Sequence, residues 1–241
     1  MIGNVWTPHP GPFPQGRSWQ DQMTTRWTIL PDPRFAEMQG ALRERLGFVA
    51  RSIEPENFAS LLDPLARQVL DHGLAEAGAH EGTIWLQDSE GKHLVPAYNT
   101  GPNAEKIVGK FRQPLNAGLI SMVFASEQPI VENDVYKNAR QSKLLDETLH
   151  VQTLSLIAAP LHFLKGCRGV VSCVQLEPQL GGVAAPPCQG SVDQPGIKRT
   201  GAIEEAAGFQ FADLRVIQRT ASLLSQLIEL RLLSSAVGWS D

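Results

Sequence analysis

The sequence lacks the features that characterise secreted disulfide-rich proteins and membrane-spanning proteins. Its 241 residues include three cysteines, an odd number that argues against a secreted disulfide framework. No apolar run approaches the roughly 18 to 20 residues that a membrane helix needs. The N-terminus, MIGNVWTPHPGPFPQGRSW, has neither a basic start nor a continuous apolar segment, so it is not typical of a signal peptide. We therefore expect a cytoplasmic protein with no membrane insertion.

A strong charge of one sign is also missing. The formal net charge is -4, whereas nucleic-acid-binding proteins usually concentrate lysine and arginine on one face. The chain has no glycine-rich phosphate loop of the Walker type and no Cys/His set with metal-ligand spacing. We therefore expect no nucleic-acid partner and no metal site, and the residues leave the identity of any cofactor open.

What the chain does have is an ordinary globular composition. Hydrophobic residues make up 42% and charged residues 19%, so a core can form without disulfides or metal. We expect one sizeable domain with accessory segments. The expected divisions are an N-terminal arm at 1–33, an amphipathic helix at 34–53, a main domain at 54–235 that carries a Pro/Gly-rich insertion at 178–208, and a tail at 236–241.

The N-terminal arm is rich in proline and tryptophan and shows no sustained helical or strand period. Trp6, Trp19 and Trp27 would be unusual in a purely solvated segment, since such segments are poor in aromatic residues. We therefore expect part of the arm to dock on a surface.

Helix and hairpin patterns follow one another through the first part of the main domain. Apolar residues recur at helical spacing after Phe58, and Pro64 either kinks this helix or begins its main body after Asp63. The stretches GTIWLQD and HLVPAYN predict a strand hairpin. A short helix beginning near Gly118 and a short strand at 130–132 are expected next.

The segment LSLIAAPLHFLKGCRGVVSCVQLEPQ predicts two strands, 153–163 and 167–176, that are apolar on both faces and must be covered on both sides. Cys167 and Cys173 are six residues apart, which predicts one shared face and a separation of about 20 Å. At that distance they can neither pair nor share a metal, so we expect two buried, chemically inert side chains. Cys188, in the insertion, is expected to be an incidental loop thiol.

The strongest helical period lies near the C-terminus. Leu214, Ile217, Ala221, Leu224 and Ile228 step by three and four residues, and a helix over 212–235 would be roughly 36 Å long. One small sheet cannot cover that length. We expect the surplus apolar surface to contact the N-terminal helix or a second copy of the chain in a homodimer.

The order of these elements resembles the GAF domain family. The matching stretches are LLDPLARQVLDHGLAEAGAHEGTIWLQD, QPLNAGLISMVFASEQPIVENDV, TLSLIAAPL with CRGVVSCVQL, and FQFADLRVIQRTASLLSQL. The resemblance implies an α+β fold, in which a central antiparallel β-sheet carries the terminal helices on one face and a pocket covered by loops and helices on the other. It also implies a regulatory protein that binds a small molecule or nothing and dimerises through its terminal helices.

The resemblance also bears on particular chemistries. Free methionine-R-sulfoxide reductases and bilin-binding members use cysteines near Gly118 or shortly before Thr153, and this chain has no cysteine in either segment. This departure argues against an enzyme and against covalent bilin attachment. His150 leaves heme as a less favoured alternative. Cyclic-nucleotide binding stays an alternative without support, because Phe211-Ala212-Asp213 matches the common start of the last helix better than the nucleotide-binding signature.

If the implied pocket binds a ligand, the candidate lining residues combine apolar walls with a few polar groups, the usual composition of a small-ligand site. They are Tyr98, Leu119, Asn133, Asp134, Tyr136, His150, Thr153 and Ser155. Structural roles compete with this interpretation, because Asn133 and Asp134 could cap the next helix and Tyr136 could fill the core.

Two functional hypotheses follow. In the first, a non-enzymatic GAF domain senses a small molecule and signals through its terminal helices to a dimer or to a regulatory protein partner. In the second, a ligand-free GAF scaffold acts as a protein–protein interaction module through the arm, the insertion and the helices. We expect no output segment beyond Asp241, and we expect any output to pass through another chain or through the protein's own assembly.

Overall fold

A computed structural model describes residues 36–164, 166–177 and 208–238. The expected arm at 1–33 and nearly all of the insertion at 178–208 lie outside the described residues. The chain divides into two units, Met1–Gly40 and Ala41–Asp241. Helix α2 (Met38–Arg51) forms within the segment predicted to be an amphipathic helix, and the rest of this description concerns the larger unit.

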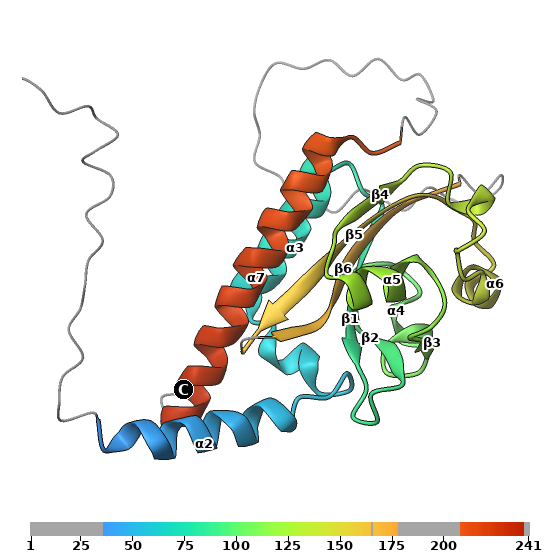
Figure 1. The fold of residues 1–241 in the computed structure, drawn as a ribbon. Helices are drawn as coiled ribbons and strands as arrows, with labels where there is room; N and C mark the ends of the chain where they lie inside the picture. The colour runs from blue at the N-terminus through green and yellow to red at the C-terminus, as the bar shows by residue number, and fades with distance from the viewer. Residues whose placement is uncertain (1–35, 165, 178–207, 239–241) are drawn as a thin grey trace, which may run out of the picture. The chain divides into compact units, whose positions relative to one another are not determined.

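The larger unit contains one antiparallel sheet of six strands in the order β3-β2-β1-β6-β5-β4 (Figure 1). The two long central strands come from the apolar segment that predicted a hairpin, and the short edge strands come from the connecting segments. The strands are β1 (Glu81–Gln87), β2 (His93–Asn99), β3 (Gln113–Pro114), β4 (Ile130–Glu132), β5 (Thr153–Phe163) and β6 (Gly166–Leu176).

Two of the helices in this unit have clear N-terminal signals. Asp63 caps α3 by accepting a hydrogen bond from the backbone N–H of Ala66, and Pro64 occupies the first helical position, so this proline starts the helix. A capping box formed by Gln210 and Asp213 begins the longest helix. The helices are η2 (Phe58–Leu61), α3 (Pro64–Glu76), α4 (Ala104–Ile107), α5 (Leu119–Ser126), η3 (Val135–Lys137), α6 (Leu144–Leu149) and α7 (Phe211–Val237).

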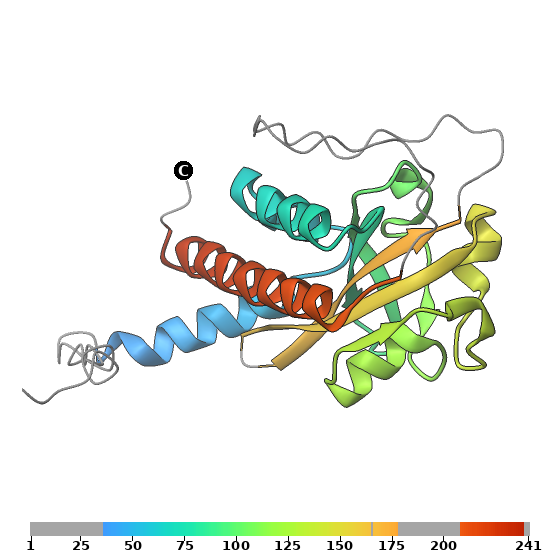
Figure 2. The ribbon, with the colours of Figure 1, turned by 90° about the horizontal axis from the view of Figure 1, so that it is seen from above.

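The two faces of the sheet are covered by different helices (Figure 2). α3 and α7 pack together on one face, where Leu70, Ile157 and Ile217 belong to the main core. α5 packs on the opposite face, above Trp85 and Val170. This arrangement confirms the predicted α+β class with an antiparallel sheet, and it explains why β5 and β6 are apolar on both faces.

The register between β5 and β6 corrects the prediction for the cysteines. Pairing shifts between Leu161 and His162, so that Cys173 pairs with Ile157 while Cys167 pairs with His162. Directly paired residues point to the same side of a sheet. Cys173 therefore lies in the core beneath α7, while Cys167 points to the other face, and the expectation of one shared face is wrong. The physical reason is the irregularity, which reverses the alternation of the strand.

Cys173 is buried, as expected, whereas Cys167 is only half-buried, so the expectation of two buried cysteine side chains is correct for Cys173 alone. Burial raises the pKa of Cys173 to about 12 and also raises the pKa of Cys167. A raised pKa disfavours the thiolate form, which is the nucleophilic form of cysteine. Cys188 lies outside the described residues.

Within residues 36–164, 166–177 and 208–238, no helix is long and apolar enough to cross a membrane.

Candidate functional site

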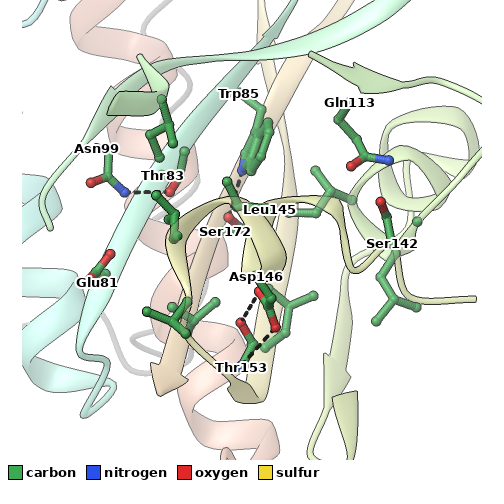
Figure 3. A pocket seen from close by; sticks show the side chains of 18 of the residues that line it. Glu81, Thr83, Trp85, Asn99, Gln113, Ser142, Leu145, Asp146, Thr153 and Ser172 are labelled. Carbon is green, nitrogen blue, oxygen red and sulfur yellow. Dashed lines mark hydrogen bonds between the residues drawn. The ribbon is translucent and has the colours of Figure 1, made fainter. Parts of the chain in front are cut away.

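A cavity of about 70 Å³ lies on the sheet face opposite α7, between the central strands and the segments that cover them (Figure 3). Its floor comes from β1, β5 and β6, and its walls come from α4, α5, α6 and their connecting loops. The apolar lining residues are Trp85, Ile107, Leu119, Ile120, Leu145, Leu149, Val151, Leu156, Val174 and Leu176. The polar ones are Glu81, Thr83, Asn99, Asn103, Gln113, Gln141, Ser142, Asp146, Thr153 and Ser172.

Strand alternation selects the residues of the cavity floor. Glu81, Thr83 and Trp85 are every second residue of β1, so all three side chains point to the same side. Ser172 pairs with Thr83 across the two strands and faces the cavity with it. The intervening Ile84 belongs to the core on the helix side.

Two hydrogen bonds order the polar part of this floor. Trp85 Nε1 donates to Ser172 Oγ at 2.9 Å, and Asn99 Nδ2 donates to Thr83 Oγ1 at 2.9 Å. Asn99 Oδ1 in turn accepts a hydrogen bond from the backbone N–H of Gly101 at 2.8 Å. These bonds hold both hydroxyl oxygens in defined positions at the cavity surface (Figure 3).

Helix α6 covers the cavity and is held to β5 by one carboxylate. Asp146 Oδ2 accepts a hydrogen bond from the backbone N–H of Thr153 at 3.0 Å, and its Oδ1 accepts one from Thr153 Oγ1 at 2.9 Å. No residue of α6 is fully buried. The attachment of this cover to the strand therefore depends strongly on the Asp146–Thr153 pair.

The cavity has a negative electrostatic character. Two of its lining residues are acidic, Glu81 and Asp146, and none of the described lining residues is lysine, arginine or histidine. Burial raises the pKa of the Glu81 carboxyl, and a hydrogen bond with Asn99 lowers it, with burial the larger effect. Such a site favours neutral or positively charged molecules over anions.

Only two of the eight predicted site residues line this cavity. Leu119 is the first residue of α5 and is buried in the cavity wall. Thr153 begins β5 and joins α6 to the strand. The other six predicted side chains do not line the cavity.

Tyr98 and Ser155 sit on strands that line the cavity, but they do not line it themselves. Tyr98 pairs with Ile84 and packs against the core on the helix side, where the Arg67 guanidinium lies 5.5 Å from its ring centroid. Ser155 is fully buried and follows an irregularity in the pairing of β5, between Thr153 and Ser155. This irregularity changes the alternation that the sequence suggested.

The remaining predicted residues are exposed around the edge of the domain. Asn133 bonds twice to the backbone of Phe209, donating through Nδ2 at 2.9 Å and accepting through Oδ1 at 2.8 Å. Asp134 pairs with Lys137, whose ammonium also lies over the ring of Tyr136. His150 ends α6 with a positive φ of 55°, which the sequence did not indicate.

Most of the cavity residues were missed by sequence reasoning. The alternation Glu81-Thr83-Trp85 was a usable signal, because it places two polar side chains on one face of a strand that is otherwise apolar. Gln113, Gln141, Ser142 and Asp146 had no such signal. They reach the cavity through chain segments whose course depends on the tertiary fold.

The lining residues do not supply obvious catalytic machinery. The described cysteines are outside the cavity, and the described part of the chain contains no group of three or more His, Cys, Asp or Glu residues placed to hold a metal ion. Ligand pockets for drug-sized molecules measure about 300–1,000 Å³. This cavity is suited to a much smaller molecule, on the order of five non-hydrogen atoms if each occupies about the space of one water.

Comparisons with known proteins place the fold in a family. The GAF domain family model matches residues 61–183, which is just over half of the chain. A comparison with curated protein sequences gave no match.

Solved structures similar to this chain include two GAF domains of phosphoenolpyruvate-protein phosphotransferases. The one from Acinetobacter is 17% identical, with a TM-score of 0.47 and coverage of 83% of this chain and 96% of that chain. The one from Coxiella burnetii is 19% identical, with a TM-score of 0.49 and coverage of 84% and 97%. Free methionine-R-sulfoxide reductase from Neisseria meningitidis, solved with its substrate, is 19% identical, with a TM-score of 0.47 and coverage of 87% and 96%. Since the family model matches more than half of its residues, this chain belongs to the GAF domain family.

Proposed function

We propose that this protein is a non-catalytic regulatory GAF domain, which binds a small molecule in the cavity and transmits its occupancy to the terminal helices. The observation that carries the proposal is the double role of the central strands. Leu156 lines the cavity, while the next residue of β5, Ile157, belongs to the core beneath α7. On β6, Val174 and Cys173 divide in the same way. A ligand that displaces these strands would therefore also displace the side chains that pack against α7.

A second link joins the cavity side of the domain to the start of α7. The two hydrogen bonds between Asn133 and Phe209 connect the residue that follows β4 to the residue that precedes the cap of α7. Phe209 is itself buried in the core. A change in the strands can thus alter the beginning of the helix as well as its middle.

The exposed side of α7 supports a regulatory role in which this helix binds another protein chain. Leu223, Leu230 and Val237 recur at seven-residue spacing, and their exposed fractions are 49%, 61% and 42%. Leu233 extends the same side of the helix. Seven-residue apolar spacing is the pattern of helices that pack against another helix. We propose that this stripe contacts a second copy of the chain or a regulatory protein partner.

Enzymatic and large-cofactor alternatives have less support. The described lining residues contain no thiol, and burial raises the pKa of both described cysteines. A phosphate of a cyclic nucleotide would meet two acidic lining residues with no cationic side chain among the described ones. The volume of about 70 Å³ is small for a heme, and His150 does not line the cavity.

The small volume also supports a second candidate, a ligand-free scaffold that works as an interaction module. In that case the cavity holds only water and the exposed stripe of α7 carries the whole function. The two candidates differ in whether a bound molecule changes α7.

A fragment screen followed by hydrogen exchange separates these candidates. The probes are alcohols, amines, amides and carboxylates of a few non-hydrogen atoms, added to the isotopically labelled full-length chain. We expect at least one probe to shift amide signals of β1 and α6 and to slow hydrogen exchange in α7. Thr83→Leu, which fills the cavity floor, should abolish both effects, whereas Gln218→Leu on exposed α7 surface should not. If no probe binds, or binding leaves α7 unchanged, the sensor proposal is wrong and the scaffold is favoured.

A further inference from the structure

We infer that the cavity is selective for a small uncharged carbonyl compound, whose oxygen accepts hydrogen bonds from the hydroxyls of both Thr83 and Ser172. This inference rests on the proposed function, because it specifies the ligand class of the same cavity. It is carried by two buried hydroxyl groups that lie side by side on the cavity floor, each with a hydrogen that no described residue accepts.

Thr83 and Ser172 occupy neighbouring positions in one row across the sheet. Thr83 on β1 pairs with Asn99 of β2 on one side and with Ser172 of β6 on the other. Directly paired residues point to the same side of a sheet, with their Cβ atoms about 4.5–5.5 Å apart. Both residues line the cavity and are almost fully buried, with exposed fractions of 8% and 3%. One acceptor atom can therefore lie within hydrogen-bond distance of both hydroxyls.

Neighbouring side chains determine the role of each hydroxyl. The indole Nε1 of Trp85 can only donate, so Ser172 Oγ is the acceptor of the 2.9 Å bond between them. Asn99 Oδ1 accepts from the backbone N–H of Gly101 at 2.8 Å, so the Nδ2 of the same amide donates to Thr83 Oγ1 at 2.9 Å. Each hydroxyl therefore accepts from a neighbour and still has its own hydrogen to donate (Figure 3).

Neither hydrogen has an acceptor in the described part of the chain. Thr83 Oγ1 and Ser172 Oγ act only as acceptors in the hydrogen bonds formed there. A buried donor without an acceptor is rare in folded proteins, because it has lost the hydrogen bond that it would make with water. Both hydroxyls border the cavity, so an oxygen atom of a bound molecule can accept both hydrogens. A carbonyl oxygen suits this position because it has two lone pairs and no hydrogen of its own.

The surrounding residues select against charged ligands at the two hydroxyls. Glu81 lies two residues before Thr83 on the same face of β1, about 7 Å along the strand. It would repel a bound carboxylate, and the described lining residues include no cationic side chain to offset this repulsion. An ammonium group has no lone pair, so it cannot accept the two hydrogens. The buried side chains of Ile107, Leu119 and Leu156 provide apolar walls for the rest of the molecule.

Four probes of the same branched shape and size test this inference on the full-length chain at neutral pH. Acetone and acetamide are neutral carbonyl compounds, acetate is an anion, and isopropylamine is present as its cation. Each is titrated into isotopically labelled protein while the indole N–H signal of Trp85 and the amide signals of β1 and β6 are followed by NMR. We expect saturable binding of acetone and acetamide, in about the millimolar range for molecules of this size. Acetate and the isopropylammonium ion should cause no saturable shift.

Substitutions at Thr83 separate the effect of the hydroxyl from that of side-chain shape. Thr83→Val keeps the branched shape and removes the hydroxyl, so binding of acetone and acetamide should weaken by about three- to tenfold, the scale of one hydrogen bond. Thr83→Ser keeps the hydroxyl, so its affinity should stay closer to that of wild type. Thr148→Val is the matched control, because the Thr148 hydroxyl bonds to the backbone oxygen of Leu144 and does not line the cavity. The comparison of probes on the wild-type chain holds even if a variant fails to fold.

The carbonyl assignment is overturned if acetate or the isopropylammonium ion binds as tightly as acetone, because the two hydroxyl donors would then not select the ligand. Equal affinity of Thr83→Val and wild type would also overturn it. If neither acetone nor acetamide binds but another fragment does and alters α7, the carbonyl assignment is wrong while the sensor proposal stands. If no fragment binds, the hydroxyls donate only to water and both proposals fail.

Discussion

At the scale of single residues, Glu81 couples stability to pH. Its pKa is raised in the folded protein, chiefly by burial, so the folded state holds this proton more tightly than the unfolded state does. The free energy of unfolding therefore loses this contribution as the pH rises from the ordinary value of 4.5 through the raised value. At neutral pH the ionised carboxylate destabilises the fold, because its burial costs more than the hydrogen bond with Asn99 returns.

Glu81→Gln should consequently stabilise the protein at pH 7. We expect a gain of about 0.5 kcal/mol, because partial solvent exposure reduces the electrostatic penalty. The gain should shrink as the pH falls below the ordinary pKa, where the wild-type carboxyl is also neutral. Urea unfolding at several pH values measures it, with Glu147→Gln as the control. A constant difference between wild type and Glu81→Gln at all pH values would contradict the prediction.

Asn133 has a structural role that its exposure conceals. Asn133→Ala removes both hydrogen bonds to the backbone of Phe209, so we expect a loss of about 1–2 kcal/mol of stability. Hydrogen exchange in the first turn of α7 should accelerate. Asp134→Ala, which removes only the exposed pair with Lys137, should cost less than about 1 kcal/mol. Similar effects of the two variants would contradict this assignment.

At the scale of elements, the cover of the cavity is held by a small number of bonds. Thr153→Val keeps the shape of the side chain but removes the hydrogen bond from Oγ1 to Asp146. We expect a loss of about 1 kcal/mol and faster hydrogen exchange in α6, with little change in α7. Thr148→Val is a matched control, because the Thr148 hydroxyl bonds only within α6, to the backbone oxygen of Leu144. Equal exchange rates in both variants would show that the Asp146–Thr153 pair does not hold α6.

The contact between α3 and α7 depends on a close approach at Gly73. A Cβ atom at this position would overlap the side chain of Thr220, so Gly73→Ala should destabilise the domain by about 1–3 kcal/mol in thermal or urea unfolding. Gly47→Ala in α2 is the control, because its Cβ would meet only the end of Arg51 at 3.6 Å. It should be neutral or stabilising by up to about 1 kcal/mol. Thr220→Ala should restore part of the stability lost in Gly73→Ala, and failure to do so would reject this packing explanation.

At the scale of the whole molecule, the exposed stripe of α7 predicts self-association. If Leu223 and Leu230 lie in a dimer contact, the double variant Leu223→Lys/Leu230→Lys should weaken the dimer by about 100-fold or more, because two charges would be buried without partners. Size-exclusion chromatography with light scattering measures this change, and Gln218→Lys on another side of the helix should have no effect. A monomeric wild-type protein would exclude the homodimer and leave a different protein as the partner.

Much of the fold could be predicted because the relevant signals are local. The period of the last helix, the Asp63-Pro64 start of α3 and the apolar segment that forms β5 and β6 all depend on residues close in sequence. The ordered series of such elements also identified the family, which the match over residues 61–183 confirmed.

The cavity could not be predicted to the same extent, because its lining depends on how strands pair and on which segments cover them. A shift in register moves Thr153 into the cavity and Ser155 out of it, and another separates Cys167 from Cys173. Asp146 and Gln113 become neighbours of Glu81 and Trp85 only after distant segments fold over the same sheet face. Helix and strand periods were thus set by the local chain, whereas the chemistry of the cavity was decided by long-range contacts, since a shift of one residue reverses every side chain that follows it.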